Sequence, residues 1–289
     1  MNEPPIDLDT DELLSLVQRS WDPSVEALDH LAVGFGAHHW QGRVDGEPRY
    51  FVTVDELGDR HTLQSLEAAY AGASALARDG LDFVVAPLEP FVVPLGDRGV
   101  SVSPWLAGIP VAATDKVVTA TMLERLHAVD PTALGVTLPS WQPVAGPDLP
   151  DRVATAVREP WSHGPYGERS REAVVAALDD IARWTARYGE LGRIARTRRW
   201  VPTHGEPGSH NQMITPSGTV LVDWETLRLA PAERDLRALN RGDRLMLELF
   251  DVEWRLDEIS QYATWFAGPH GDTADDRTAF EDLLHELSR

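Results

Sequence analysis

Two stretches of the N-terminal third have apolar residues at helical spacing. Residues 11–19 place leucines and a valine on one side, and Asp9 just before them is a suitable N-cap. Residues 62–78 are rich in Leu and Ala and are followed by Gly80, a residue that commonly ends a helix. Both stretches are therefore predicted as amphipathic helices.

Between and after these helices the pattern changes to short β-branched and aromatic runs. Residues 28–44 favour a hairpin whose turn contains Gly34 and Gly36, and residues 50–54 (YFVTV) favour a third strand. Further predicted strands cover residues 83–86, 91–93 and 100–103. A five-stranded sheet accompanied by a helix can be drawn from these runs, and this is the predicted architecture of the segment.

Beyond residue 110 the helical period dominates. Residues 130–150 contain several prolines and no period, so they are predicted as a connecting loop. The predicted helices cover residues 114–127, 151–158, 168–188, 233–239, 245–250, 257–267 and 275–287. The pattern therefore indicates a chain with a small sheet-containing part followed by a larger, mainly helical part.

One stretch, residues 204–225 (HGEPGSHNQMITPSGTVLVDWE), carries the candidate chemistry. It places the carboxylate of Glu206 and the carboxamide of Asn211 in a loop before a predicted hairpin. Since a hairpin returns the chain on itself, Asp223 should emerge beside Asn211. Oxygen ligands of this kind suit Mg²⁺, which is usually shared with substrate phosphates, as in phosphoryl transfer.

The pattern H-G-E-x-x-x-x-N, a hairpin and then D-W-E resembles the catalytic and metal-binding segments of the aminoglycoside phosphotransferase family, which shares the protein-kinase fold. The resemblance implies that Glu206 orients an acceptor hydroxyl and takes its proton, and that Asn211 and Asp223 hold Mg²⁺ against the phosphates of ATP or GTP. It also implies that Asp235 supports the catalytic loop. The family usually has Asp where this chain has Glu206, which is longer by one methylene.

The resemblance further implies an α+β fold of two-lobed, protein-kinase-like type. Residues 1–106 would form a small antiparallel-sheet lobe that binds the nucleotide and ends in a hinge. Residues 107–289 would form the larger, mainly helical lobe with the catalytic loop and the substrate site. The expected nucleotide-binding residues are Gly34, Gly36, His38, His39, Ser103, Trp105 and Leu106. The expected substrate contacts are Glu225, Trp254 and Trp265.

The sequence departs from the family at the third strand. Aligning that strand places Thr53 where kinases carry the lysine that holds the nucleotide phosphates, and the chain's lone lysine, Lys116, lies far away. Either another group contacts the phosphates or this contact is absent. The candidates for such a contact are His38, His39, Arg43 and Arg49.

Composition narrows the class of protein and its partners. With 43% hydrophobic and 25% charged residues the chain is of ordinary globular type. It has no cysteine, no long apolar run and no signal-peptide pattern, so we expect a cytoplasmic protein, monomeric or homodimeric. A net charge of −20 argues against nucleic acid and membrane as partners and favours a cationic, hydroxylated small molecule.

Three other interpretations stay open. Each acidic residue taken singly could be an ordinary turn or capping residue. His204, Glu206 and His210 could ligate zinc in a hydrolase, although their loop contains no helix that would place ligands at the usual spacing. The missing lysine also allows a non-catalytic, kinase-like protein that binds a nucleotide or another ligand.

Overall fold

The computed structural model describes residues 1–5, 7–58 and 60–289. It divides into two compact units, one made of Met1–Trp141 with Trp200–Leu239 and the other of Gln142–Arg199 with Asn240–Arg289. The first unit therefore combines the sheet with the segment that carries Glu206, Asn211 and Asp223. The lobe boundary between residues 106 and 107 stays a prediction.

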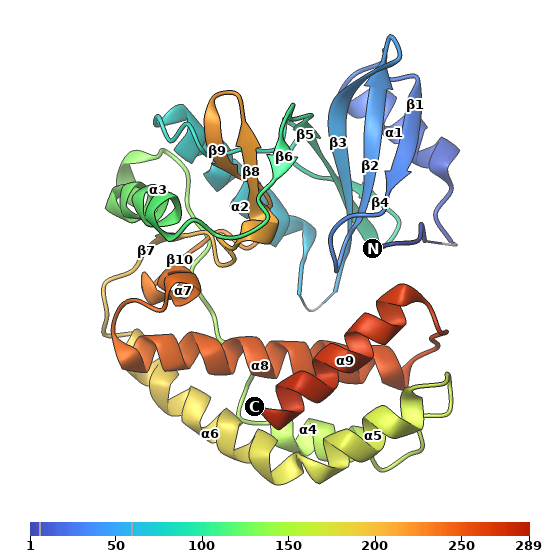
Figure 1. Cartoon of the computed structure of the whole chain (residues 1–289), viewed down its shortest axis with the longest axis vertical. Coiled ribbons are helices and arrows are strands. Elements are labelled where there is room, and N and C mark those ends of the chain that lie inside the picture. Colours follow the sequence, from blue (N-terminus) through green and yellow to red (C-terminus); the bar gives the residue numbers. More distant parts are fainter. Residues whose placement is uncertain (6, 59) are drawn as a thin grey trace. The chain divides into compact units, whose positions relative to one another are not determined.

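The first unit contains a five-stranded antiparallel sheet, counted over the described residues and labelled in Figure 1. Its strands, in spatial order, are β1 (Ala27–Leu31), β2 (His38–Val44), β3 (Glu47–Glu56), β5 (Arg98–Pro104) and β4 (Val93–Leu95). The hairpin predicted for residues 28–44 is confirmed as β1 and β2. Strand β3 extends beyond the predicted residues 50–54 at both ends because it pairs with β2 on one side and β5 on the other.

Successive side chains of β3 point to opposite faces of the sheet. One face is packed in the apolar core, and the other, called the functional face below, carries Thr53 and Asp55. Val52 and Val54 are buried in a cluster with the apolar face of helix α1 (Thr10–Ser20). Thr53 and Asp55 point to the opposite face, since successive strand side chains alternate. Helix α2 (Leu63–Arg78), predicted for residues 62–78, begins shortly after β3 and has Thr62 as its N-cap.

The predicted strand at residues 83–86 is wrong. This run enters no sheet and makes a single parallel bridge, Val84 with Leu221. Phe83 and Val84 are buried among side chains of α2 and the hairpin that follows Asn211, so their apolar character serves packing rather than strand pairing. The strand predicted for residues 91–93 begins only at Val93.

Shorter elements complete the first unit. They are β6 (Ile109–Pro110), α3 (Lys116–Ala128), the 3₁₀ turn η1 (Pro131–Ala133), β7 (Val201–Thr203), η2 (Ser209–Asn211), β8 (Gln212–Thr215), β9 (Gly218–Leu221), β10 (Arg228–Ala230), α7 (Glu233–Leu236) and η3 (Arg237–Leu239). Strands β8 and β9 form the predicted hairpin, with β6 along its edge (Figure 1).

The second unit is helical in its described elements. They are α4 (Leu149–Ala156), α5 (Gly167–Ala176), α6 (Leu178–Ala195), α8 (Arg244–Ala267) and α9 (Ala274–Ser288). No helix in the described parts of the chain is long and apolar enough to cross a membrane.

In this unit, one predicted helix is divided into two, and two other predicted helices form a single one. The helix predicted for residues 168–188 is interrupted at Ala177, whose φ of −102° and ψ of 6° end α5 and precede α6. The predicted apolar face is still used, since Val174 and Ile181 are buried on either side of the break. Conversely, the two helices predicted at 245–250 and 257–267 are one helix, α8, because buried residues such as Leu256 continue its inner face.

Candidate active site

A buried carboxylate, Asp235 of α7, holds the start of the loop that carries Glu206. It accepts hydrogen bonds from the backbone N–H groups of His204 (3.1 Å) and Gly205 (2.6 Å) and from Nε2 of His127 (2.9 Å). Burial alone would raise the pKa of Asp235, but the bonds from His127 and Gly205 hold that pKa below its ordinary value. The charged carboxylate therefore ties β7, α3 and α7 to one loop.

His204 orients the loop through hydrogen bonds at both nitrogens of its imidazole ring. Its Nε2 donates to the carbonyl of Val222 at 2.9 Å, and its Nδ1 accepts the N–H of Glu206 at 3.3 Å. The ring packs against Trp224, with centroids 4.6 Å apart, and burial lowers the pKa of His204 so that the ring is neutral. Both ring nitrogens are thus occupied by backbone groups, which leaves neither for the zinc site considered from the sequence.

Gly205 is required by its backbone and its neighbour. Its φ is +103°, and a Cβ at this position would lie 2.4 Å from Nη2 of Arg234. The Arg234 guanidinium is fixed there because Nη1 donates to Oγ1 of Thr203 and to the carbonyl of Thr226. Glycine is the residue that tolerates both the left-handed backbone and this close approach.

Asn211 joins the loop to the hairpin. The side-chain Nδ2 of Asn211 donates to the backbone carbonyl of Glu206 at 3.0 Å. The backbone carbonyl of Asn211 accepts the N–H of Val222, also at 3.0 Å. The first bond orients the carboxamide so that Oδ1 is its remaining polar atom. The second bond holds Val222, and Asp223 is the next residue along the chain. Asp223 has a left-handed backbone conformation with φ of +68°.

Asp223 lies among other acidic groups. Burial, followed by repulsion from Asp223, raises the pKa of Asp55 to about 7. Burial and the neighbouring Asp223, with which Glu225 shares a hydrogen bond, likewise raise the pKa of Glu225 well above its usual range. Oδ2 of Asp55 and Oε2 of Glu225 are shielded from solvent and have no hydrogen-bond partner among the described residues. This concentration of oxygen atoms suits a cation.

Glu206 has the charge state that a base needs. Burial would raise the pKa of Glu206, but His210 and the charge of Arg60 oppose burial and hold that pKa at about 2. Oε1 lies 3.7 Å from Nη2 of Arg60, and Oε2 lies 3.7 Å from Nε2 of His210. The side chain is 22% exposed, so an incoming molecule can reach the carboxylate.

The structure separates the two predicted histidines. His39 pairs with Thr53 across β2 and β3, and its Nδ1 lies 3.2 Å from Oγ1 of Thr53. A Cβ on Gly34 would lie 3.0 Å from Nε2 of His39, so the ring sits directly under the glycine turn. His38 lies on the opposite face of β2, with its ring 6.2 Å from that of Trp40.

The predicted hinge follows β5. Ser103 pairs with Phe51, and the N–H of Trp105 donates to the carbonyl of Arg49 at 2.9 Å. The Trp105 ring lies 6.4 Å from the Phe51 ring, centroid to centroid. Leu106 follows in a segment without regular structure that leads to β6.

The predicted substrate residues fall in different units. Glu225 follows the hairpin of the first unit, whereas Trp254 and Trp265 lie on α8 of the second. Nε1 of Trp265 donates to Oδ1 of Asp276 at 2.9 Å, which links α8 to the cap of α9. Trp265 therefore has a packing role in addition to any contact with a substrate.

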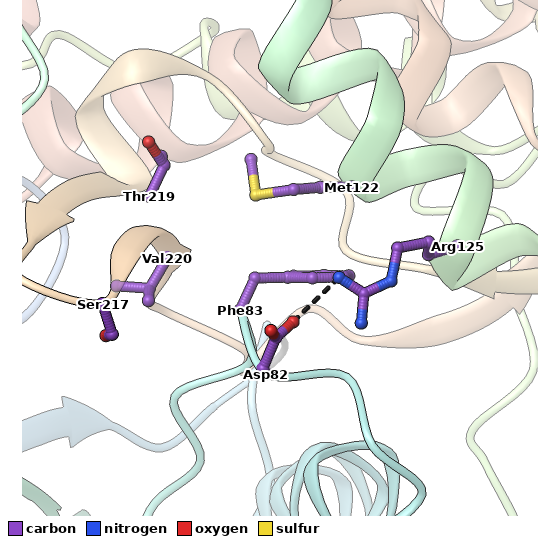
Figure 2. Close-up of a pocket in the computed structure, with 7 residues that line it drawn as sticks. All are labelled: Asp82, Phe83, Met122, Arg125, Ser217, Thr219 and Val220. Atoms are coloured by element: carbon purple, nitrogen blue, oxygen red, sulfur yellow. Dashed lines mark hydrogen bonds and ion pairs between the residues drawn. The ribbon is translucent and has the colours of Figure 1, made fainter.

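A hollow of about 190 Å³ in the first unit is lined by other residues. They are Asp82, Phe83, Met122, Arg125, Ser217, Thr219 and Val220. Figure 2 shows Arg125 directed toward Asp82, with which it forms an ion pair at 2.8 Å. None of the predicted site residues lines this hollow.

Sequence reasoning missed Asp55 and Arg60. The position of Asp55, two residues after Thr53 on the same strand, was a usable signal, because i and i+2 share a face. Arg60 lies in the connection between β3 and α2, where the sequence alone indicates no direction for a side chain.

Comparison with known proteins identifies relatives of the whole chain. The model of a family described as the phosphotransferase enzyme family matches residues 32–272. Protein StrN of Streptomyces griseus is 31% identical over 252 residues, which are 76% of this chain and 76% of that protein.

Solved structures share the fold at low sequence identity. A spectinomycin phosphotransferase, crystallised with ADP and spectinomycin, superposes with a TM-score of 0.70 at 13% identity, covering 96% of this chain and 94% of that one. A choline/ethanolamine kinase family protein from Mesorhizobium loti gives a TM-score of 0.54 at 14% identity, covering 96% and 93%. These likenesses confirm the predicted α+β, protein-kinase-like fold.

Proposed function

The chain belongs to the phosphotransferase enzyme family of aminoglycoside-kinase type, and on this basis we propose that it transfers the γ-phosphate of ATP or GTP to a hydroxyl of a small molecule. The proposed acceptor is an aminoglycoside or a related antibiotic, which would make the protein an antibiotic-resistance enzyme. The observation that carries the proposal is the pair of bonds through which Asn211 joins the Glu206 loop to the strand leading to Asp223.

Glu206 is the proposed catalytic base. Because its pKa is about 2, its carboxylate is ionised at neutral pH and can accept a hydrogen bond from the acceptor hydroxyl and then its proton. The contacts of Asp235 and His204 with the backbone N–H groups of Gly205 and Glu206 hold the loop that carries this carboxylate. Positioning of this kind supplies much of the rate in phosphoryl transfer, where the protein does little covalent chemistry.

Asn211 and Asp223 are the proposed Mg²⁺ ligands. Mg²⁺ in such sites is held by one or two carboxylates together with substrate phosphates, and Asn211 Oδ1 with the Asp223 carboxylate fits that donor set. Among the described residues no group of three or more His, Asp or Glu side chains is arranged to hold a metal ion on its own. When bound, the ion would neutralise charge on the nucleotide phosphates.

The nucleotide is proposed to lie against the functional face of the sheet. The turn with Gly34 and Gly36, both at positive φ, would lay backbone N–H groups over the phosphates, with His39 beneath it. The backbone from Ser103 through Trp105 to Leu106 would hydrogen-bond the base. His38 is left out of this set because it lies on the other face.

The acceptor contacts are proposed on each unit separately. Glu225 is the proposed contact on the first unit, and Trp254 and Trp265 are the proposed contacts on the second. An acidic chain favours a cationic acceptor through ion pairs and cation–π contacts. We place the reaction in the cytoplasm, catalysed by a monomer or a homodimer, with neither nucleic acid nor membrane as partner.

A transfer assay tests the proposal. Purified protein is incubated with Mg²⁺ and ATP or GTP and with a panel of aminoglycosides, spectinomycin, choline and ethanolamine, and phosphorylated product is detected by mass spectrometry. We expect product on one acceptor class, dependent on Mg²⁺ and abolished in Glu206→Gln. Ser217→Ala, at the exposed tip of the β8–β9 hairpin, is the matched control and should retain the activity.

The alternative is a non-catalytic, kinase-like protein that binds a nucleotide or another ligand. The observation that favours it is Thr53, an uncharged residue at the strand position where kinases use lysine. Mg²⁺-dependent nucleotide binding without consumption of ATP or GTP, across the whole panel, would support this alternative and contradict the transfer reaction.

A further inference from the structure

The functional face of β3 lacks a cation at the position of Thr53. Of the candidates considered from the sequence, Arg43 is committed elsewhere, since its Nε lies 2.5 Å from Asp29 and its Nη1 donates to the carbonyl of Gly46. His39 is next to Thr53, but burial lowers its pKa to about 4, so the ring is neutral at physiological pH. Arg49 lies four residues before Thr53 on β3, roughly 13 Å away at about 3.3 Å per residue. A charge for phosphates bound beside Thr53 would therefore come from another residue.

Arg60 is placed between the two parts of the candidate site that a polyphosphate would touch. Its Nη1 lies 3.7 Å from where a Cβ of Gly36 would be, and its Nη2 lies 3.7 Å from Oε1 of Glu206. The guanidinium thus reaches both the glycine turn and the proposed base. The γ-phosphate of a bound nucleotide would have to lie between these two groups, because the turn covers the phosphates and the base faces the acceptor.

A positive charge at Arg60 would offset the repulsion that the acidic groups of the site exert on an incoming anion. Its Nη2 lies 3.7 Å from Oε1 of Glu206, so the guanidinium faces the carboxylate next to the place proposed for the γ-phosphate.

The contact between Arg60 and Glu206 is loose. A separation of 3.7 Å exceeds the range of a charge-assisted hydrogen bond, about 2.7–2.9 Å. The Arg60 side chain is also 39% exposed, so an incoming ligand can reach its guanidinium. Its planar fork of donors suits phosphate oxygens better than an ammonium does.

We propose that Arg60 binds the β- and γ-phosphates of the nucleotide and supplies the positive charge that the strand position of Thr53 lacks. The inference rests on the proposed function for the identity of the ligand. It adds a residue from the β3–α2 connection to the phosphate site and explains how that site can work without a strand lysine.

Nucleotide binding measured by calorimetry with Mg²⁺ tests the proposal, with ATP, ADP, AMP and adenosine as probes. Loss of a hydrogen-bonded charge contact is worth about 1.5–3 kcal/mol, so Arg60→Gln should weaken ATP binding roughly 10- to 150-fold. Adenosine, which has no phosphate, should bind the variant as it binds the wild type. Arg60→Lys keeps the charge and should restore part of the affinity for ATP.

Arg78→Gln is the matched control, since Arg78 is an exposed arginine at the end of α2 that contacts the Ser74 carbonyl, and it should bind ATP like the wild type. Equal ATP affinity of wild type and Arg60→Gln, or an equal loss for ATP and adenosine, would overturn the role of Arg60 while leaving the proposed function intact. A wild-type protein that binds neither these four probes nor GTP would overturn both.

Discussion

Asn211 donates its carboxamide Nδ2–H to the backbone carbonyl of Glu206 over 3.0 Å, so a proposed metal ligand and the proposed base are parts of one hydrogen-bonded loop. The bond uses Nδ2 to hold the loop and leaves Oδ1 of Asn211 for the proposed cation. A substitution at Asn211 should therefore also change the position of Glu206, and this effect can be measured.

Asn211→Ala should lower kcat and raise the Mg²⁺ concentration needed for half-maximal activity. It removes a proposed metal oxygen together with the bond to the Glu206 carbonyl, and changes of this kind cost about 10- to 100-fold in metal affinity or activity. The measurement is a Mg²⁺ titration of the transfer rate. An unchanged Mg²⁺ midpoint would exclude Asn211 as a ligand.

The pH dependence of folding should contain a contribution from Glu206. Its pKa of about 2 in the folded protein lies below its ordinary value of 4.5, so ionised Glu206 stabilises the fold above about pH 4.5, and this stability is lost as the pH falls toward 2. The full contribution is at most about 3 kcal/mol. Urea unfolding of wild type and Glu206→Gln from pH 6 to pH 3 should show their stabilities converging as the pH falls. A constant difference between the two proteins would contradict the low pKa.

Asp235→Asn should destabilise the first unit by about 3 kcal/mol, because it removes a buried carboxylate that accepts three hydrogen bonds, and each group left unsatisfied costs about 1–3 kcal/mol. The amide keeps one acceptor oxygen, so its N–H donor would face the N–H of either His204 or Gly205. The free energy of unfolding in urea measures the loss. His127→Gln, which can still donate to Asp235, should lose less, and equal losses for both variants would contradict a central role for the carboxylate.

Gly205→Ala should destabilise the protein more than Gly218→Ala. Both glycines have positive φ, +103° and +126°, so both substitutions introduce backbone strain. A Cβ at Gly218 meets nothing within 4 Å, whereas a Cβ at Gly205 would lie 2.4 Å from the Arg234 guanidinium. Thermal melting of the two variants isolates the effect of this clash, and equal melting temperatures would show that Arg234 moves aside at no cost.

Local pattern was sufficient for much of the fold. The cap at Asp9 and the hairpin after Asn211 depend on neighbouring residues, and both form as predicted. Continuity was less predictable. The break at Ala177 is marked by no glycine or proline. We relate it to packing, since α5 and α6 each bury an apolar face of their own.

The sequence by itself determined the family and the chemistry proposed for Glu206, Asn211 and Asp223, because these residues lie within one loop and one hairpin whose geometry is local. It could not choose between His38 and His39, nor find Arg60. Those assignments needed the pairing of β2 with β3, which directs His39 to Thr53, and the path of the chain from β3 to α2, which brings Arg60 to Glu206. Contacts between residues far apart in sequence depend on packing, and only the tertiary structure decided them.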